Sequence, residues 1–80
     1  MSAEFEAALA RVNELSEDPG NEAKLKMYAL YKQATVGDVE GKRPGFTNPV
    51  GRAKYDAWAG VKGMSSQDAE AAYVELVNSL

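Results

Sequence analysis

Residues 28–38 of the chain read YALYKQATVGD and predict the last turns of a helix that runs into a loop. The helix extends back to residue 21 or 22, ends near Val36, and has Gly37 as its expected cap. One stripe of this helix is apolar, and the stripe roughly opposite is expected to face water. The apolar stripe holds Ala23, Met27, Leu30 and Ala34, and the water-facing stripe holds Glu22, Lys26 and Gln33.

A third stripe of the same helix alternates phenol rings with ammonium groups. It consists of Lys24, Tyr28, Tyr31, Lys32 and Thr35. Lysine attracts anions and an aromatic ring stacks on a nucleobase, so this stripe suits a ligand that carries both a phosphate and an aromatic base. The alternative is an ordinary helix boundary, where two tyrosines and a surface lysine share a face without binding anything.

The length and composition exclude several classes of function. Eighty residues predict a single domain, residues 1–80, with a small core. The chain has no cysteine and no histidine, so the usual general base and the commonest metal ligands are missing, and we expect neither an enzyme nor a metal site. The longest apolar run, residues 27–31, is far short of the roughly twenty residues that cross a bilayer. The N-terminus is acidic, unlike a targeting segment, and we expect a soluble cytoplasmic protein.

The charge is distributed unevenly along the sequence. Residues 24–62 contain eight Lys or Arg and three Asp or Glu, whereas residues 1–23 contain six acidic residues and one Arg. Residues 63–80 contain three acidic residues and no basic one. A basic centre between acidic ends favours a local anionic ligand and argues against nucleic acid as the partner.

Three further helices are predicted from start signals and apolar spacing. The first spans residues 3–15 with Ser2 as N-cap, and the third spans 49–61 after Asn48 and a proline. The fourth begins after Ser65. Because residues 37–47 are long for a linker in so small a chain, we interpret them as a connection between two helices that run in the same direction. Four amphipathic helices without a strand pattern predict an all-α bundle.

Three ordered motifs carry a resemblance to a known family. They are residues 28–38, then Arg43-Pro44-Gly45, then AKYDAW at residues 53–58. The chain closely resembles the acyl-CoA-binding protein family, whose signature combines a YxxYKQAT-G-D segment, an RPG turn and a KxxAW segment. The resemblance covers nearly the whole chain and implies a four-helix up-down-down-up bundle with a long connection between helices 2 and 3.

The resemblance also implies a function. Members of the family bind medium- and long-chain fatty acyl-CoA esters without catalysis, act as intracellular acyl-CoA pool formers and carriers, and serve acyl-CoA-consuming enzymes. It implies no cofactor, and a monomer is the default expectation. The alternative is a small helical protein-interaction module that uses the face formed by Tyr28, Tyr31 and Lys32.

Individual site residues follow from the same resemblance. Tyr28, Lys32 and Lys54 are implied to surround the 3′-phosphate of coenzyme A. Tyr31 is implied to lie against the adenine, and Tyr73 near the thioester. The acyl chain is expected in an apolar groove lined in part by Phe5, Ala8, Leu9, Leu25 and Met27, of which Leu9 and Met27 could equally be interior.

Two further positions remain open, and a third is assigned to packing. Asn13 stands where the family commonly has a lysine that assists the coenzyme A head group, and an amide carries no positive charge to make that contact. Arg43 either pins the long connection or lies close to the ligand phosphates. Trp58 is expected to be a packing anchor rather than a ligand contact.

Overall fold

The computed structural model describes residues 2–80, and these form four helices and no strand. This confirms the predicted all-α class. The helices are α1 (Ala3–Val12), α2 (Asn21–Thr35), α3 (Pro49–Ala59) and α4 (Ser66–Asn78).

Short polar side chains begin three of the helices. The Ser2 hydroxyl accepts a hydrogen bond from the Phe5 amide at the start of α1. Asn48 caps α3, and Ser65 caps α4, each by accepting from a backbone amide three residues ahead. Each cap satisfies one of the backbone donors that the first helical turn leaves unpaired. The predicted starts of α1, α3 and α4 are thereby confirmed.

Two helices end earlier than their apolar spacing predicts. Helix α1 ends at Val12 rather than at residue 15, and α3 ends at Ala59 rather than at 61. In both cases the chain continues in tighter turns, because the amide of Leu15 donates to the Val12 carbonyl and that of Val61 donates to the Trp58 carbonyl. Such turns keep apolar side chains near the same face, so periodicity alone does not reveal where the α-helix stops.

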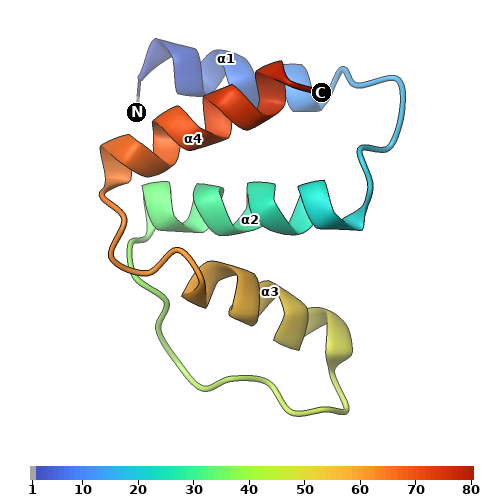
Figure 1. The fold of residues 1–80 in the computed structure, drawn as a ribbon, viewed down its shortest axis with the longest axis vertical. Helices are drawn as coiled ribbons and strands as arrows, with labels where there is room; N and C mark the ends of the chain where they lie inside the picture. The colour runs from blue at the N-terminus through green and yellow to red at the C-terminus, as the bar shows by residue number, and fades with distance from the viewer. Residues whose placement is uncertain (1) are drawn as a thin grey trace.

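The helix directions follow the up-down-down-up order that the resemblance implied (Figure 1). Helices α1 and α4 run one way, and α2 and α3 run the other way. Helix α2 lies in the middle and packs on α4 on one side and on α3 on the other, while α1 packs on α4. The molecule is flat, with extents of 35 × 28 × 15 Å. The long connection from α2 to α3 loops back along α3, which lets the two helices run in parallel.

The core is built by α1, α2 and α4. Its largest fully buried side chains are Phe5, Leu30 and Val77, one from each of these helices. Helix α3 has no buried residue. It is held to the rest by half-buried side chains and by polar contacts, and space for a ligand remains at its boundary with α2.

The prediction that Gln33 faces water is wrong. Its side chain is 2% exposed, and Nε2 donates to the Met64 carbonyl at 2.8 Å and to Asp38 Oδ1 at 2.9 Å. The turn between α3 and α4 covers this end of α2, and the Gln33 amide joins that turn at Met64 to the α2–α3 connection at Asp38. Over the range 2–80, no helix is both long and apolar enough to cross a membrane.

Candidate ligand-binding site

Two lysines from different helices meet at one tyrosine. Lys32, one turn after Tyr28 on α2, places its Nζ 5.8 Å from the centroid of the Tyr28 ring. Lys54 reaches the same ring from α3, with its Nζ at 5.4 Å. These three residues form what we call the Tyr28 cluster. The distances suit cation–π attraction, which holds two like charges near each other without a carboxylate.

Trp58 lies beside the Tyr28 cluster and contacts Lys32. The ammonium of Lys32 lies 5.7 Å from the Trp58 ring. The indole Nε1 of Trp58 donates a 2.8 Å hydrogen bond to the Gly37 carbonyl oxygen. The side chain is half-buried, which agrees with the anchoring role predicted for it. It also positions Lys32, a contact that the sequence did not reveal.

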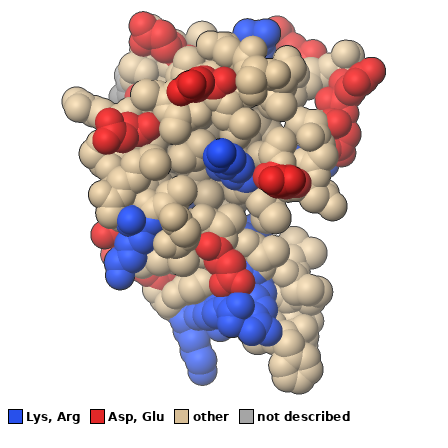
Figure 2. Space-filling model, viewed as in Figure 1, with Lys and Arg blue, Asp and Glu red and all other residues tan. Residues whose placement is uncertain are grey.

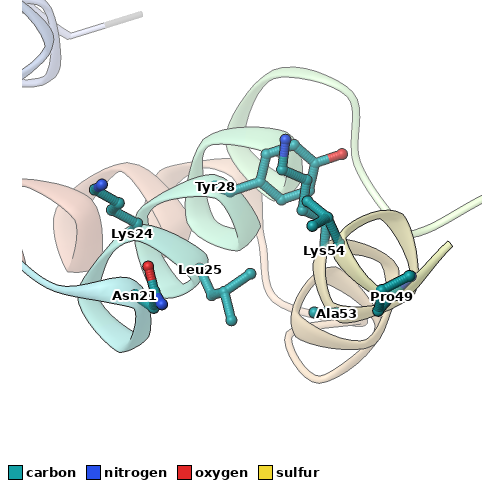
Figure 3. A pocket seen from close by; sticks show the side chains of 8 residues that line it. Asn21, Lys24, Leu25, Tyr28, Pro49, Ala53 and Lys54 are labelled. Carbon is teal, nitrogen blue, oxygen red and sulfur yellow. The ribbon is translucent and has the colours of Figure 1, made fainter.

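A cavity of about 400 Å³ lies between α2 and α3, next to the cluster (Figure 3). Its walls include Leu25 of α2 and Pro49, Val50 and Ala53 of α3, so the middle is apolar. The full lining is Asn21, Lys24, Leu25, Tyr28, Pro49, Val50, Ala53 and Lys54. Tyr28 and Lys54 therefore belong both to the cation cluster and to the wall of the apolar cavity.

The far end of the cavity is polar again. Asn21 and Lys24 lie there, and the ammonium of Lys24 pairs with Asp18 Oδ2 at 2.5 Å in the α1–α2 loop. The hydrogen bond from Lys24, with one from the Gly20 amide, keeps the pKa of the Asp18 carboxyl below its ordinary value. This exposed ion pair leaves the aliphatic stem of Lys24 against the cavity.

Basic residues concentrate on the part of the molecule around α3. Figure 2 shows blue side chains gathered at the α3 end of this face and red ones towards the α1 and α4 end. The α2–α3 connection and α3 contribute Lys42, Arg43, Arg52 and Lys54 against Asp38, Glu40 and Asp56, while α1 and α4 contribute Glu4, Glu6, Asp68, Glu70 and Glu75 against Arg11. The uneven charge of the sequence is thus a real polarity of the surface, and it favours an anion near the Tyr28 cluster.

The two remaining predicted tyrosines meet at Phe5. Tyr31 is 40% exposed on α2, and its ring stacks beside that of Phe5 with centroids 6.3 Å apart. Tyr73 of α4 is 5% exposed and contacts Phe5 edge-on at 5.1 Å. Burial raises the pKa of the Tyr73 phenol, with a smaller effect from Tyr31. Only Tyr31 therefore offers an open ring face, whereas Tyr73 mainly completes the core.

Most side chains expected to line the acyl groove do not border the α2–α3 cavity. Phe5, Ala8 and Met27 are buried in the core, and Leu9 packs against it. The reason is that α1 applies its apolar face to α4, so that face is already covered. Of the predicted lining residues, only Leu25 borders the α2–α3 cavity.

The cavity residues of α3 were not predicted from the sequence. Pro49, Val50 and Ala53 lie on one side of a short helix, and Ala53 is directly before the lysine of the third motif. The available signal was the small side chain of Ala53 next to Lys54, the lysine implied to bind phosphate. That signal indicates a cavity wall only when α3 is known to lie parallel to α2.

Arg43 pins the long connection. Its guanidinium donates two hydrogen bonds to Asp56 of α3, at 2.8 Å from Nε and 2.7 Å from Nη2. This bidentate pair keeps the pKa of Asp56 below its ordinary value. Asn13 is exposed at the C-terminal end of α1 and borders neither the cavity nor the Tyr28 cluster.

Comparisons with known proteins agree with this geometry. Residues 2–77 match the family model described as acyl CoA binding protein. A protein of Saccharomyces cerevisiae called Acyl-CoA-binding protein is 47% identical over 76 residues, which are 95% of this chain and 87% of that protein. Acyl-CoA-binding protein homolog 1 of Caenorhabditis elegans is 45% identical over 80 residues, covering this whole chain and 93% of the homologue.

The fold has a similar counterpart among solved structures. The crystal structure of Oryza sativa Acyl-CoA-Binding Protein 2 superimposes with a TM-score of 0.90 at 45% sequence identity. The superposition covers 96% of this chain and 86% of that one.

Proposed function

The chain belongs to the acyl-CoA-binding protein family, and from that premise we propose that it binds fatty acyl-CoA esters and releases them chemically unchanged. The ligand is amphiphilic: a nucleotide head that carries phosphates is joined by a thioester to an apolar chain. A site for it must therefore combine cations, an aromatic surface and an apolar groove.

The observation that carries the proposal is the shared position of Tyr28 and Lys54. Both border the apolar cavity between α2 and α3, and both belong to the Tyr28 cluster. A ligand with an anionic head and an apolar tail can engage both features without a gap. The volume of about 400 Å³ also falls within the range of small-molecule sites.

Lys32, Lys54 and the Tyr28 hydroxyl are proposed to hold the 3′-phosphate. A charge-assisted hydrogen bond to phosphate contributes about 1.5 to 3 kcal/mol. The exposed ring of Tyr31 is proposed to contact the adenine, since stacking needs one free ring face. The buried Tyr73 is proposed to border the ligand near the thioester only through the edge of its ring.

The acyl chain is proposed to follow the α2–α3 cavity past Leu25, Val50 and Ala53. Each buried methylene contributes up to about 0.8 kcal/mol, so affinity should rise with chain length until the apolar wall ends at Asn21 and Lys24. Medium- and long-chain esters should therefore bind more tightly than short ones.

The biological role we propose is that of a monomeric cytoplasmic carrier. It would hold a pool of acyl-CoA and deliver it to acyl-CoA-consuming enzymes, with no cofactor and no catalytic step. The alternative, a protein-interaction module built on the face of Tyr28, Tyr31 and Lys32, is less favoured, because it assigns no role to the cavity beside that face.

A thermodynamic cycle tests the head-group assignment. Wild-type protein and Lys54→Ala are titrated calorimetrically with palmitoyl-CoA and with its 3′-dephospho analogue. In the wild type, loss of the phosphate should weaken binding about ten- to a hundredfold, and in Lys54→Ala the difference should shrink markedly.

The matched control is Lys62→Ala, which removes an exposed lysine outside the cluster and should bind both ligands like the wild type. An undiminished difference in Lys54→Ala would remove Lys54 from the phosphate site, and folding is checked by circular dichroism in every variant.

A further inference from the structure

Two apolar side chains project into solvent where the chain enters α3. Phe46 is 82% exposed and Val50 is 67% exposed. They are the two most exposed of the large apolar residues described, and they are four positions apart across a tight turn. Neither the fold nor the proposed ligand site explains Phe46, which packs on little and does not border the α2–α3 cavity.

This turn is held in place rather than loose. The Asn48 amide donates to the Gly45 carbonyl at 3.0 Å, and the Asn48 side chain caps α3. Nearby, the Tyr55 hydroxyl donates to the Gly41 carbonyl at 3.1 Å, and Arg43 is paired to Asp56. The fold therefore holds Phe46 in a fixed position, although leaving its ring in water is unfavourable.

The charged residues closest in sequence to these side chains are basic. Residues 41–54 contain Lys42, Arg43, Arg52 and Lys54 and no acidic residue. Arg43 is neutralised by Asp56, which leaves three cations close to two exposed apolar groups. We call residues 41–54 the Phe46 tip. Its combination of an aromatic ring, an aliphatic side chain and surrounding cations is the pattern by which proteins attach to anionic lipid surfaces.

We propose that the Phe46 tip docks on an anionic lipid bilayer. The lysines and arginine approach the charged head groups, and Phe46 and Val50 enter the boundary between head groups and acyl chains. A protein partner is less favoured, because Phe46 projects outside the α2–α3 cavity, the apolar recess that adjoins the tip, whereas a bilayer needs only projecting apolar groups beside cations. The acidic side chains of α1 and α4 lie away from the tip and would orient it toward the membrane.

Docking in this orientation would bring the apolar cavity to the membrane. Val50 belongs both to the tip and to the cavity wall, so the cavity mouth lies beside the docked surface. If the chain binds acyl-CoA as proposed above, an acyl chain could pass between bilayer and cavity with little exposure to water. The docking itself rests on the tip alone and is tested separately from ligand binding.

The test is co-sedimentation of the full chain with vesicles of phosphatidylcholine, with and without phosphatidylserine. The wild type should bind the phosphatidylserine vesicles, bind pure phosphatidylcholine much less, and lose binding as salt is raised. Phe46→Ser should weaken vesicle binding about tenfold, the effect of withdrawing an aromatic ring from an apolar layer. Lys42→Glu should weaken it at least about fivefold.

Val36→Ser is the matched control. Val36 is 56% exposed and lies just after α2, at the opposite end of the parallel α2–α3 pair from the start of α3 (Figure 1). It should bind vesicles like the wild type. Equal binding by Phe46→Ser and wild type would overturn the docking role of the tip, and absence of wild-type binding to phosphatidylserine vesicles would overturn the bilayer as its partner. Palmitoyl-CoA titration of Phe46→Ser in vesicle-free solution should match the wild type, so a failure of docking is distinguishable from a failure of ligand binding.

Discussion

The indole Nε1 of Trp58 donates a 2.8 Å hydrogen bond to the carbonyl oxygen of Gly37, and this bond joins α3 to the end of α2. Gly37 begins the long connection between these helices and has a φ of 105°, which an L side chain rarely adopts. The bond thus fixes the parallel placement of α2 and α3 at the point where the connection leaves α2. The same indole lies 5.7 Å from the ammonium of Lys32, so packing and the ligand site depend on one side chain.

Trp58→Phe should therefore affect both stability and binding. The phenyl ring keeps much of the packing but leaves the Gly37 carbonyl without its donor, and we expect a loss of about 1 to 2 kcal/mol in the free energy of unfolding. Because Lys32 also loses part of its aromatic support, palmitoyl-CoA should bind a few-fold more weakly. Urea unfolding followed by far-ultraviolet circular dichroism measures the first effect, and calorimetry measures the second. Unchanged stability would show that the hydrogen bond does not hold α3.

Phe5→Ala should act on the core and not on the ligand. Phe5 is fully buried and contacts Tyr73 and Tyr31, so its truncation should cost about 3 to 5 kcal/mol. Phe5→Leu preserves most of the volume and should retain both the fold and wild-type affinity for palmitoyl-CoA. A large loss of affinity in folded Phe5→Leu would instead support the original expectation that Phe5 lines the acyl groove.

Ala53→Leu should weaken binding of the acyl chain without weakening binding of the coenzyme A head group. The larger side chain enters the α2–α3 cavity without touching the charges of Lys32 and Lys54. Affinity for palmitoyl-CoA should fall about tenfold or more, whereas the affinity for free coenzyme A should hardly change. Ala71→Leu is a matched control on the exposed side of α4. Equal weakening of both ligands in Ala53→Leu would contradict the placement of the acyl chain.

Acid should weaken the fold through two paired aspartates. The pKa of Asp38 is lowered mainly by the hydrogen bond from Gln33 and then by the Gly63 amide, and the pKa of Asp56 is lowered mainly by Arg43. Each carboxylate is ionised more readily in the folded than in the unfolded chain, where the pKa is about 3.9. Its stabilisation is complete above that value and is lost as the pH falls through the lower pKa of the folded state.

Asp56→Asn isolates one of these contributions. This variant should be less stable than the wild type at pH 7, and the difference should shrink as the pH falls below about 4. Urea unfolding at a series of pH values makes the comparison. A difference that stays constant with pH would mean that the ion pair with Arg43 does not contribute through its charge.

Much of the fold was predictable because its signals are local. Ser2, Asn48 and Ser65 cap helices where the sequence placed them, and the length of the α2–α3 connection indicated parallel helices. The burial of Gln33 was not predictable from its own helix, because the group that covers it belongs to the turn at Met64.

The site was predictable in part for the same reason. Tyr28 and Lys32 are one turn apart on α2, so their proximity follows from helical geometry. Lys54 joined them only through the family resemblance, since the contact depends on how α3 lies against α2. The groove expected along α1 stays a prediction, because apolar spacing on that helix does not distinguish a face that covers a core from one that lines a ligand groove.

The most direct test of the account is calorimetric titration of the wild-type chain with palmitoyl-CoA, free coenzyme A and free palmitate. If one ligand spans the Tyr28 cluster and the α2–α3 cavity, palmitoyl-CoA should bind tightly with one-to-one stoichiometry. Free coenzyme A and free palmitate should each bind at least about a hundredfold more weakly, because one loses the buried chain and the other loses the phosphate contacts. Absence of palmitoyl-CoA binding by folded protein would contradict the central claim, as would palmitate binding as tightly as the thioester.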